Sequence, residues 1–157
     1  MYRDRFFEVL ESPYTPYVAI ELIYAIVVIC FNLNLGNLNK QLKHHFDIDK
    51  MINQKDVSIA SNVMSYENNI SWHFLFFGIL LIIIGFIIPI LFSMINKSSY
   101  KREEIKNAIW FIIAIVIVVN FFLIISISRA LLSPIIIATL IVCAVGATLG
   151  SLAISNT

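Results

Sequence analysis

The sequence predicts an all-α integral membrane protein with four transmembrane helices, a short N-terminal interfacial helix and one long extramembrane loop. Of the 157 residues, 59% are hydrophobic and 13% are charged, whereas a soluble domain is roughly 45–50% apolar and about 25% charged. The mean hydropathy is +0.87. Four apolar stretches are close to the roughly 20 residues that a helix needs to cross the hydrocarbon core. Their runs of Ile and Leu lack the alternation of transmembrane strands, so helices are predicted.

The first 16 residues, MYRDRFFEVLESPYTP, form a head that mixes apolar and charged side chains. This mixture predicts a short amphipathic helix at the membrane surface, with a partner-docking helix as the alternative. The first apolar stretch follows at residues 17–35. Arg3 and Arg5 lie among acidic residues and no small-residue cleavage site follows, so we expect an uncleaved helix rather than a signal peptide.

Residues 36–71 form the predicted extramembrane loop. In its first half, Leu38, Leu42 and Phe46 recur at near-helical spacing, which predicts a helix lying on the outer surface. The second half is rich in Ser and Asn and is expected to be irregular. The loop is too short to fold alone and is expected to rest on the helices or on a neighbouring subunit.

The loop also holds the densest group of possible metal ligands, in the run HHFDID: His44, His45, Asp47 and Asp49. Adjacent histidines on a helix point in different directions and rarely share a zinc ion. A solvated surface is therefore the favoured interpretation, and we expect neither a metal nor a cofactor.

The second apolar stretch covers residues 72–95. Gly78 and Gly85, seven residues apart, are expected to mark one close-packed side of its helix. Pro89 is expected to kink the same helix. A basic cytoplasmic loop at residues 96–108 then leads to the third stretch.

The third and fourth apolar stretches cover residues 109–128 and 131–155. The connection SISRALLSP between them is very short, which predicts an antiparallel hairpin. Pro134 falls in the first turn of the last helix, where proline is tolerated.

The fourth stretch differs from the others because small residues replace much of its Ile and Phe. Gly146 and Gly150 form a G-x-x-x-G pattern, and the row beside it is small as well: Cys143, Ala147 and Ser151. In lipid, small residues let two helix backbones approach closely, and this close packing supplies the association energy. We therefore expect a homo-oligomer, and the residues alone leave open whether this face packs within the chain or between copies.

Two polar residues lie at membrane depth. Glu21 is about one turn into the first stretch, and Asn120 is near the middle of the third. An intramembrane carboxyl is a functional candidate by default, and a carboxamide normally bonds another helix. A proton or ion site is possible at Glu21, but an interfacial or structural carboxylate is the favoured interpretation.

No catalytic residues are predicted, and we expect the protein not to be an enzyme. Cys30 and Cys143 are far apart, without the C-x-x-C pair of a thiol oxidoreductase. The chain also lacks paired carboxylates at membrane depth and a nucleophile beside a base.

The distribution of Lys and Arg favours both termini on the cytoplasmic side of a bacterial inner membrane. In that orientation the inner side holds six basic residues and the outer side five. The six inner residues are candidates for docking a cytoplasmic protein: Arg3, Arg5, Lys97, Lys101, Arg102 and Lys106. Direct nucleic-acid binding is not expected.

Three functions remain open: a membrane sensor or anchor for a cytoplasmic partner, a small pore, and an intramembrane enzyme or transporter, which is the weakest. The order of a short inner head, an outer loop before SWHFLFF, the SISRALLSP turn and a small-residue last helix resembles the small four-helix membrane subunit of bacterial antiphage systems such as Kiwa. That resemblance implies an oligomer that works with a cytoplasmic DNA-binding partner. Immunity proteins against pore-forming bacteriocins share a similar plan.

Overall fold

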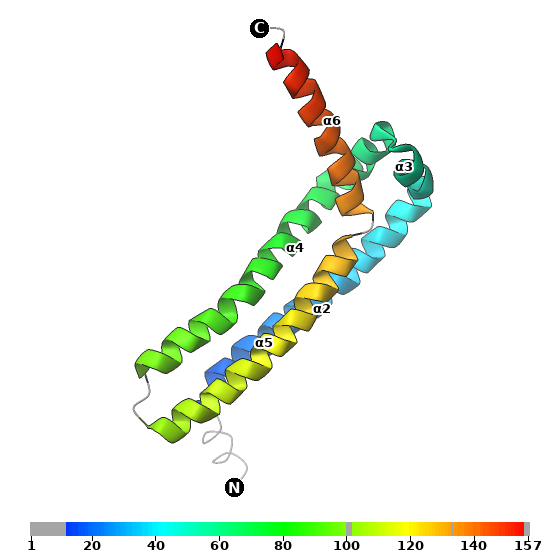
Figure 1. The fold of residues 1–157 in the computed structure, drawn as a ribbon. Helices are drawn as coiled ribbons and strands as arrows, with labels where there is room; N and C mark the ends of the chain where they lie inside the picture. Colours follow the sequence, from blue (N-terminus) through cyan, green and yellow to red (C-terminus); the bar gives the residue numbers. More distant parts are fainter. Residues whose placement is uncertain (1–11, 100–101, 133, 156–157) are drawn as a thin grey trace. The chain divides into compact units, whose positions relative to one another are not determined.

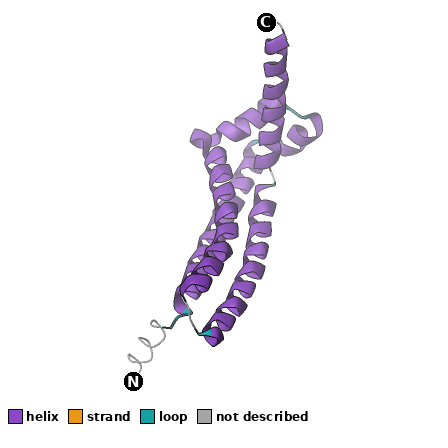
Figure 2. Cartoon of the chain, turned by 60° about the vertical axis from the view of Figure 1, so that its left-hand side comes forward, coloured by secondary structure: helices purple, strands orange, loops and turns teal. Residues whose placement is uncertain are grey.

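The computed structural model is built from helices joined by short turns (Figure 1). It describes residues 12–99, 102–132 and 134–155, with the backbone alone at 99 and 149–155. The helices are α2 (Thr15–His45), α3 (Ile48–Gln54), α4 (Val57–Ser99), α5 (Glu103–Leu131) and α6 (Ile135–Ser155). None of the described residues forms a strand, as Figure 2 shows, and the all-α prediction is confirmed.

Among the described residues, three helices, rather than the predicted four, are long and apolar enough to cross a membrane. They are α2, α4 and α5. The described apolar part of α6 is Ile135–Thr148. At 1.5 Å per residue it rises about 21 Å, which is less than the roughly 30 Å of a hydrocarbon core. The membrane-protein prediction is therefore supported by three helices.

The predicted loop at 36–71 is mostly helical, and from Val57 onward, in the second half that was expected to be irregular, only residues 66–69 depart from helical geometry. Helix α2 continues to His45, α3 follows after a short turn, and α4 begins at Val57. Helix α2 extends past residue 35 because its buried positions from Tyr24 to Leu42 are alternately four and three residues apart. Its buried apolar residues are Tyr17, Tyr24, Val28, Phe31, Leu35, Leu38 and Leu42.

Helix α4 is interrupted at four residues, Tyr66 to Asn69, whose backbone angles are not helical. Glu67, Asn68 and Asn69 have φ of 40°, 57° and 65°. Asparagine enters this left-handed region more readily than most residues, so the NN pair suits the break. The hydroxyl of Ser71 donates to the carbonyl of Val63 at 2.7 Å and so satisfies the interrupted end. Pro89 lies further along the same helix, where the backbone angles are helical.

The chain divides into two compact units. The first comprises the described part of Met1–Cys30 with Leu81–Ile125, and the second comprises Phe31–Leu80 with the described part of Ser126–Thr157. In the first unit, the ring of Tyr17 packs edge-on against Phe92, with centroids 4.8 Å apart.

In the second unit, Phe31 lies between Phe74 and Phe77, with ring centroids 5.7 Å away in each case. Gly78 is packed against the same ring and against Leu131, since a Cβ at Gly78 would lie 2.6 Å from Cδ1 of Leu131. The core of this unit thus depends on a residue without a side chain.

Within the second unit, α6 leads away from the last turn of α5, as Figures 1 and 2 both show. Within this unit, the last turn of α5 and the start of α6 therefore do not lie antiparallel, as the predicted hairpin would require. Ile135 and Ala138 are fully buried, and the hydroxyl of Thr139 lies 3.4 Å from the sulfur of Met64. The difference arises because residues 57–65 are helical and supply Met64 and its neighbours, which α6 covers.

Candidate functional site

The strongest candidate site is a buried polar cluster in the first unit. Glu21 enters it from the buried face of α2, between Tyr17 and Tyr24. Both carboxyl oxygens of Glu21 are buried, and neither has a hydrogen-bond partner among the described residues. The side chain of Asn120 approaches this carboxyl closely enough to interact with it. The structure therefore brings together the two polar residues that the sequence singled out at membrane depth.

Asn120 is buried on α5, and its Nδ2 donates to the carbonyl oxygen of Gly85 at 3.1 Å. That oxygen would normally accept a bond from the backbone of residue 89. Residue 89 is proline, which has no N–H to give. Asn120 therefore supplies, from another helix, the donor that Pro89 removes.

Tyr24 adds a second bond of this kind. Its hydroxyl donates to the carbonyl oxygen of Leu81 at 2.9 Å. Gly85 makes the approach possible, because a Cβ at that position would clash with the hydroxyl of Tyr24. Side chains from α2 and α5 thus bond to neighbouring backbone groups of α4, and these bonds tie the three helix segments of the unit together.

The cluster has more acceptors than donors. Oε1 and Oε2 of Glu21 and Oδ1 of Asn120 are all buried without a partner among the described residues. Leaving a buried acceptor unpaired costs about 1–3 kcal/mol, and burying an unpaired carboxylate costs more. A proton on Glu21 would provide the missing donor for Asn120. The arrangement is therefore suited to holding a proton.

A groove of about 300 Å³ lies beside this cluster, between α2 and α5. Its lining residues are Val18, Glu21, Leu22, Ala25, Ile112, Ile115 and Val116. Glu21 contributes to this wall, but its carboxyl oxygens are buried away from the surface. The groove itself is therefore apolar and offers no polar path to the carboxyl.

The small residues predicted for packing fall into two groups. Gly78 and Gly85 are buried in contacts within the chain. By contrast, Cys143 and Ala147 are exposed on α6, and no atom lies within 4 Å of where a Cβ on Gly146 would be. Gly150 and Ser151 lie further along α6, where the surroundings of the side chains fall outside the described residues.

The basic candidates are only partly described, because Arg3, Arg5 and Lys101 lie outside the described residues. Lys97 and Arg102 are exposed, whereas Lys106 is half-buried near the start of α5. The carbonyl oxygen of Lys106 accepts a bond of 3.2 Å from Nδ2 of the buried Asn96. This bond links the last part of α4 to the first turn of α5, on the two sides of the basic loop.

The histidine run forms ring contacts. The rings of His44 and His45 lie 5.4 Å apart, and His45 lies 5.5 Å from Tyr66. The described residues contain no group of three or more side chains placed to hold a metal ion.

Sequence reasoning missed three asparagines that join helices: Asn32, Asn39 and Asn96. Nδ2 of Asn32 donates to the hydroxyl of Ser126 at 2.8 Å, and Nδ2 of Asn39 donates to the carbonyl of Ala130 at 3.0 Å. Residue 134, four positions after Ala130, is again a proline without an N–H. The seven-residue spacing of Asn32 and Asn39, alongside the buried face of α2, is the signal that could have revealed them.

Comparison with protein-family models, with curated proteins and with solved structures finds no match for this chain. The proposals that follow therefore rest on the residues of the chain itself.

Proposed function

We propose that this chain is a non-enzymatic subunit of a bacterial inner membrane that assembles with copies of itself and serves as a sensor or anchor for a cytoplasmic protein. In this proposal both termini face the cytoplasm, α6 is a fourth membrane helix, and the resemblance to antiphage systems gives the biological setting. The three long apolar helices support membrane embedding. The observation that carries self-assembly is the exposed small-residue face of α6.

That face has the chemistry of a helix–helix contact in lipid. Cys143, Gly146 and Ala147 lie within four residues of one another and are exposed. Small side chains allow a second helix to approach closely, and van der Waals packing drives association where no hydrophobic effect operates. Two glycines of α4, Gly78 and Gly85, already have such contacts inside the chain. A second copy is the partner that this proposal assigns to α6.

The experiment is cysteine cross-linking in native membranes followed by mass measurement in detergent. Cys143 is exposed on the proposed contact face, so oxidation of a Cys30→Ser variant is expected to give a Cys143-linked dimer. Gly146→Leu is expected to reduce that dimer strongly, because a bulky side chain separates the helices. Gly36→Leu is the matched control, since a Cβ at Gly36 would also have no atom within 4 Å. An unchanged oligomer in Gly146→Leu would refute the assignment of this face.

The anchor role requires a soluble partner, and Lys97, Arg102 and Lys106 are the described cations that would meet it. Co-purification with the products of neighbouring genes tests this role. A stoichiometric soluble protein that is lost on charge reversal at Arg102 supports the anchor. A homo-oligomer without any partner would count against it.

A pore is the second candidate, because Glu21 and Asn120 place polar groups at membrane depth. Ion flux through liposomes tests the pore, and Glu21→Gln is expected to change that flux if the cluster lies on the conducting path. The apolar groove beside Glu21 favours the anchor over the pore. An immunity-type membrane protein is a further alternative with the same plan.

A further inference from the structure

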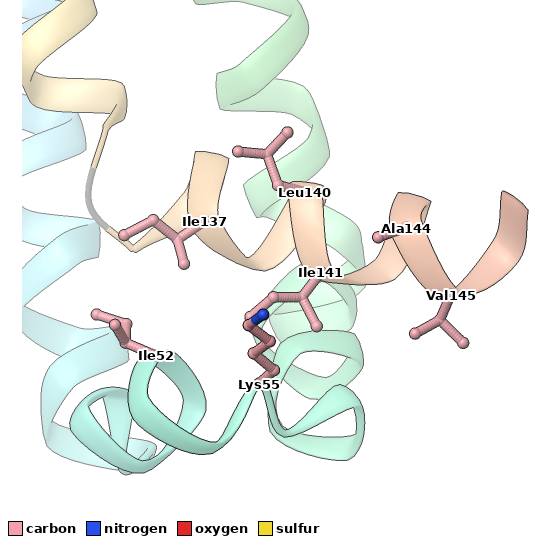
Figure 3. A pocket seen from close by; sticks show the side chains of 7 residues that line it. All are labelled: Ile52, Lys55, Ile137, Leu140, Ile141, Ala144 and Val145. Carbon is pink, nitrogen blue, oxygen red and sulfur yellow. The ribbon is translucent and has the colours of Figure 1, made fainter. Parts of the chain in front are cut away.

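A groove of about 320 Å³ lies in the second unit, between the end of α3 and α6 (Figure 3). Ile52 and Lys55 form one side, and five apolar residues between Ile137 and Val145 form the other. This volume is at the lower end of the range of small-ligand sites, about 300–1,000 Å³. It offers room for one elongated apolar group.

Lys55 is the one charged residue that lines this groove. Figure 3 shows its side chain extending from the end of α3 toward Ile141 of α6. The nearest carboxylate in the sequence, Asp56, is paired with Lys50 at 3.7 Å. Among the described residues, Lys55 itself has no ion pair. The acidic residues Asp47 and Asp49 line a separate groove on the other side of Ile52. The charge at this site is therefore positive and unmatched.

The backbone of Lys55 is left-handed, with φ 50° and ψ 42°. Glycine is the residue usually found at this position after a helix, and a residue with a side chain is strained there. The N–H of Lys55 donates to the carbonyl oxygen of Met51, which fixes the base of the side chain. The fold thus holds a cation beside the groove at a position where glycine would be less strained.

We propose that this groove binds an acyl chain of an anionic phospholipid whose phosphate pairs with Lys55. The aliphatic lining matches an acyl chain, and one ammonium group beside it matches an anionic headgroup. The α6 residues of the groove belong to the last apolar stretch of the sequence, so lipid surrounds them if α6 lies in the membrane. In that respect the inference rests on the proposed function.

Native mass spectrometry of the full chain in detergent tests this site, with phosphatidylglycerol and phosphatidylcholine as the added lipids. Wild type is expected to retain phosphatidylglycerol in preference to phosphatidylcholine. Lys55→Gly is expected to bind phosphatidylglycerol about fivefold more weakly, which corresponds to about 1 kcal/mol per lysine. Glycine suits the left-handed backbone, so this variant is expected to fold at least as stably as wild type.

Two further variants complete the test. Lys40→Gln removes an exposed cation from α2, outside the groove, and is expected to leave the preference unchanged. Ala144→Leu fills the groove and is expected to reduce retention of phosphatidylglycerol. Equal retention of the two lipids by wild type, or an unchanged preference in Lys55→Gly, would overturn the proposal.

The same spectra report the number of subunits. An oligomer that shows no lipid preference refutes the lipid site and leaves self-assembly standing. A monomer that retains phosphatidylglycerol supports the lipid site and refutes self-assembly.

Discussion

Replacement of Asn120 by leucine tests the bond that joins α5 to α4 at membrane depth. The substitution keeps the side chain at a similar size and removes the Nδ2 donor. The carbonyl of Gly85, which accepts that donor at 3.1 Å, is then left without a partner, because Pro89 has no N–H. We expect Asn120→Leu to destabilise the folded chain, because this buried carbonyl oxygen then has no hydrogen-bond donor.

Two contributions set the magnitude. An interhelical hydrogen bond in a membrane protein contributes about 0.6 kcal/mol on average and up to about 1.7. A buried acceptor left unpaired costs about 1–3 kcal/mol. Leucine offsets part of this loss, because Oδ1 of Asn120 is itself buried without a partner. The expected net loss in free energy of unfolding is about 1–2 kcal/mol.

A double-mutant cycle isolates the role of Pro89. In a Pro89→Ala background the backbone N–H of residue 89 is restored and can bond to the carbonyl of Gly85. Asn120→Leu is then expected to cost about 0.6 kcal/mol or less. The measurement is reversible unfolding in mixed micelles with increasing dodecyl sulfate, followed by circular dichroism. Each variant is compared with wild type at the same lipid-to-detergent ratio.

The matched control is Pro134→Ala, since Asn39 rather than Asn120 bonds to the carbonyl four residues before Pro134. Asn120→Leu is expected to be additive with Pro134→Ala, within about 0.3–0.5 kcal/mol. If Asn120→Leu is equally costly with proline and with alanine at position 89, the reasoning about the missing donor is refuted.

Three further substitutions separate packing from chemistry. Gly78→Ala is expected to destabilise the fold by about 1–3 kcal/mol through overpacking, because its Cβ would meet Leu131 at 2.6 Å. A Cβ at Gly36 would have no atom within 4 Å, so Gly36→Ala is expected to stabilise α2 by up to about 1 kcal/mol. Equal effects of the two substitutions on thermal unfolding would contradict both expectations. Glu21→Gln keeps the shape of the side chain and adds a donor, so it is expected to fold. Its free energy of unfolding is expected to equal or exceed that of wild type, because the amide supplies a donor to the unpaired acceptors of the cluster. A clear loss of stability in the same unfolding measurement would contradict this.

Much of the helical architecture follows from residue spacing. The alternation of four and three residues that begins at Tyr24 continues through Leu38 and Leu42, which explains why α2 does not end where its apolar composition ends. Hydropathy alone places the boundary at residue 35, because it measures transfer to lipid rather than contact with neighbouring helices. Spacing was therefore the better guide to the length of this helix.

The path of α6 could not be predicted from local sequence. A short connection is compatible with a hairpin and also with a helix that continues onward. The outcome depends on whether α3 and the first turns of α4 offer a surface near Ile135, and that surface exists because residues 57–65 are helical. The hydrogen-bond partner of Asn120 could not be predicted either, because the position of Asn120 beside the carbonyl of Gly85 is evident only when α4 and α5 are placed together.

The two proline–asparagine bonds impose different conditions on the order in which the chain is made. Ribosomes add about 5–20 residues per second, and Asn120 follows Gly85 by 35 residues. The carbonyl of Gly85 therefore leaves the ribosome about 2–7 s before its donor. Asn39, by contrast, precedes Ala130 by 91 residues and is already present when that carbonyl emerges. If α4 enters a bilayer before α5 is made, the carbonyl of Gly85 enters without a protein donor, whereas the carbonyl of Ala130 does not.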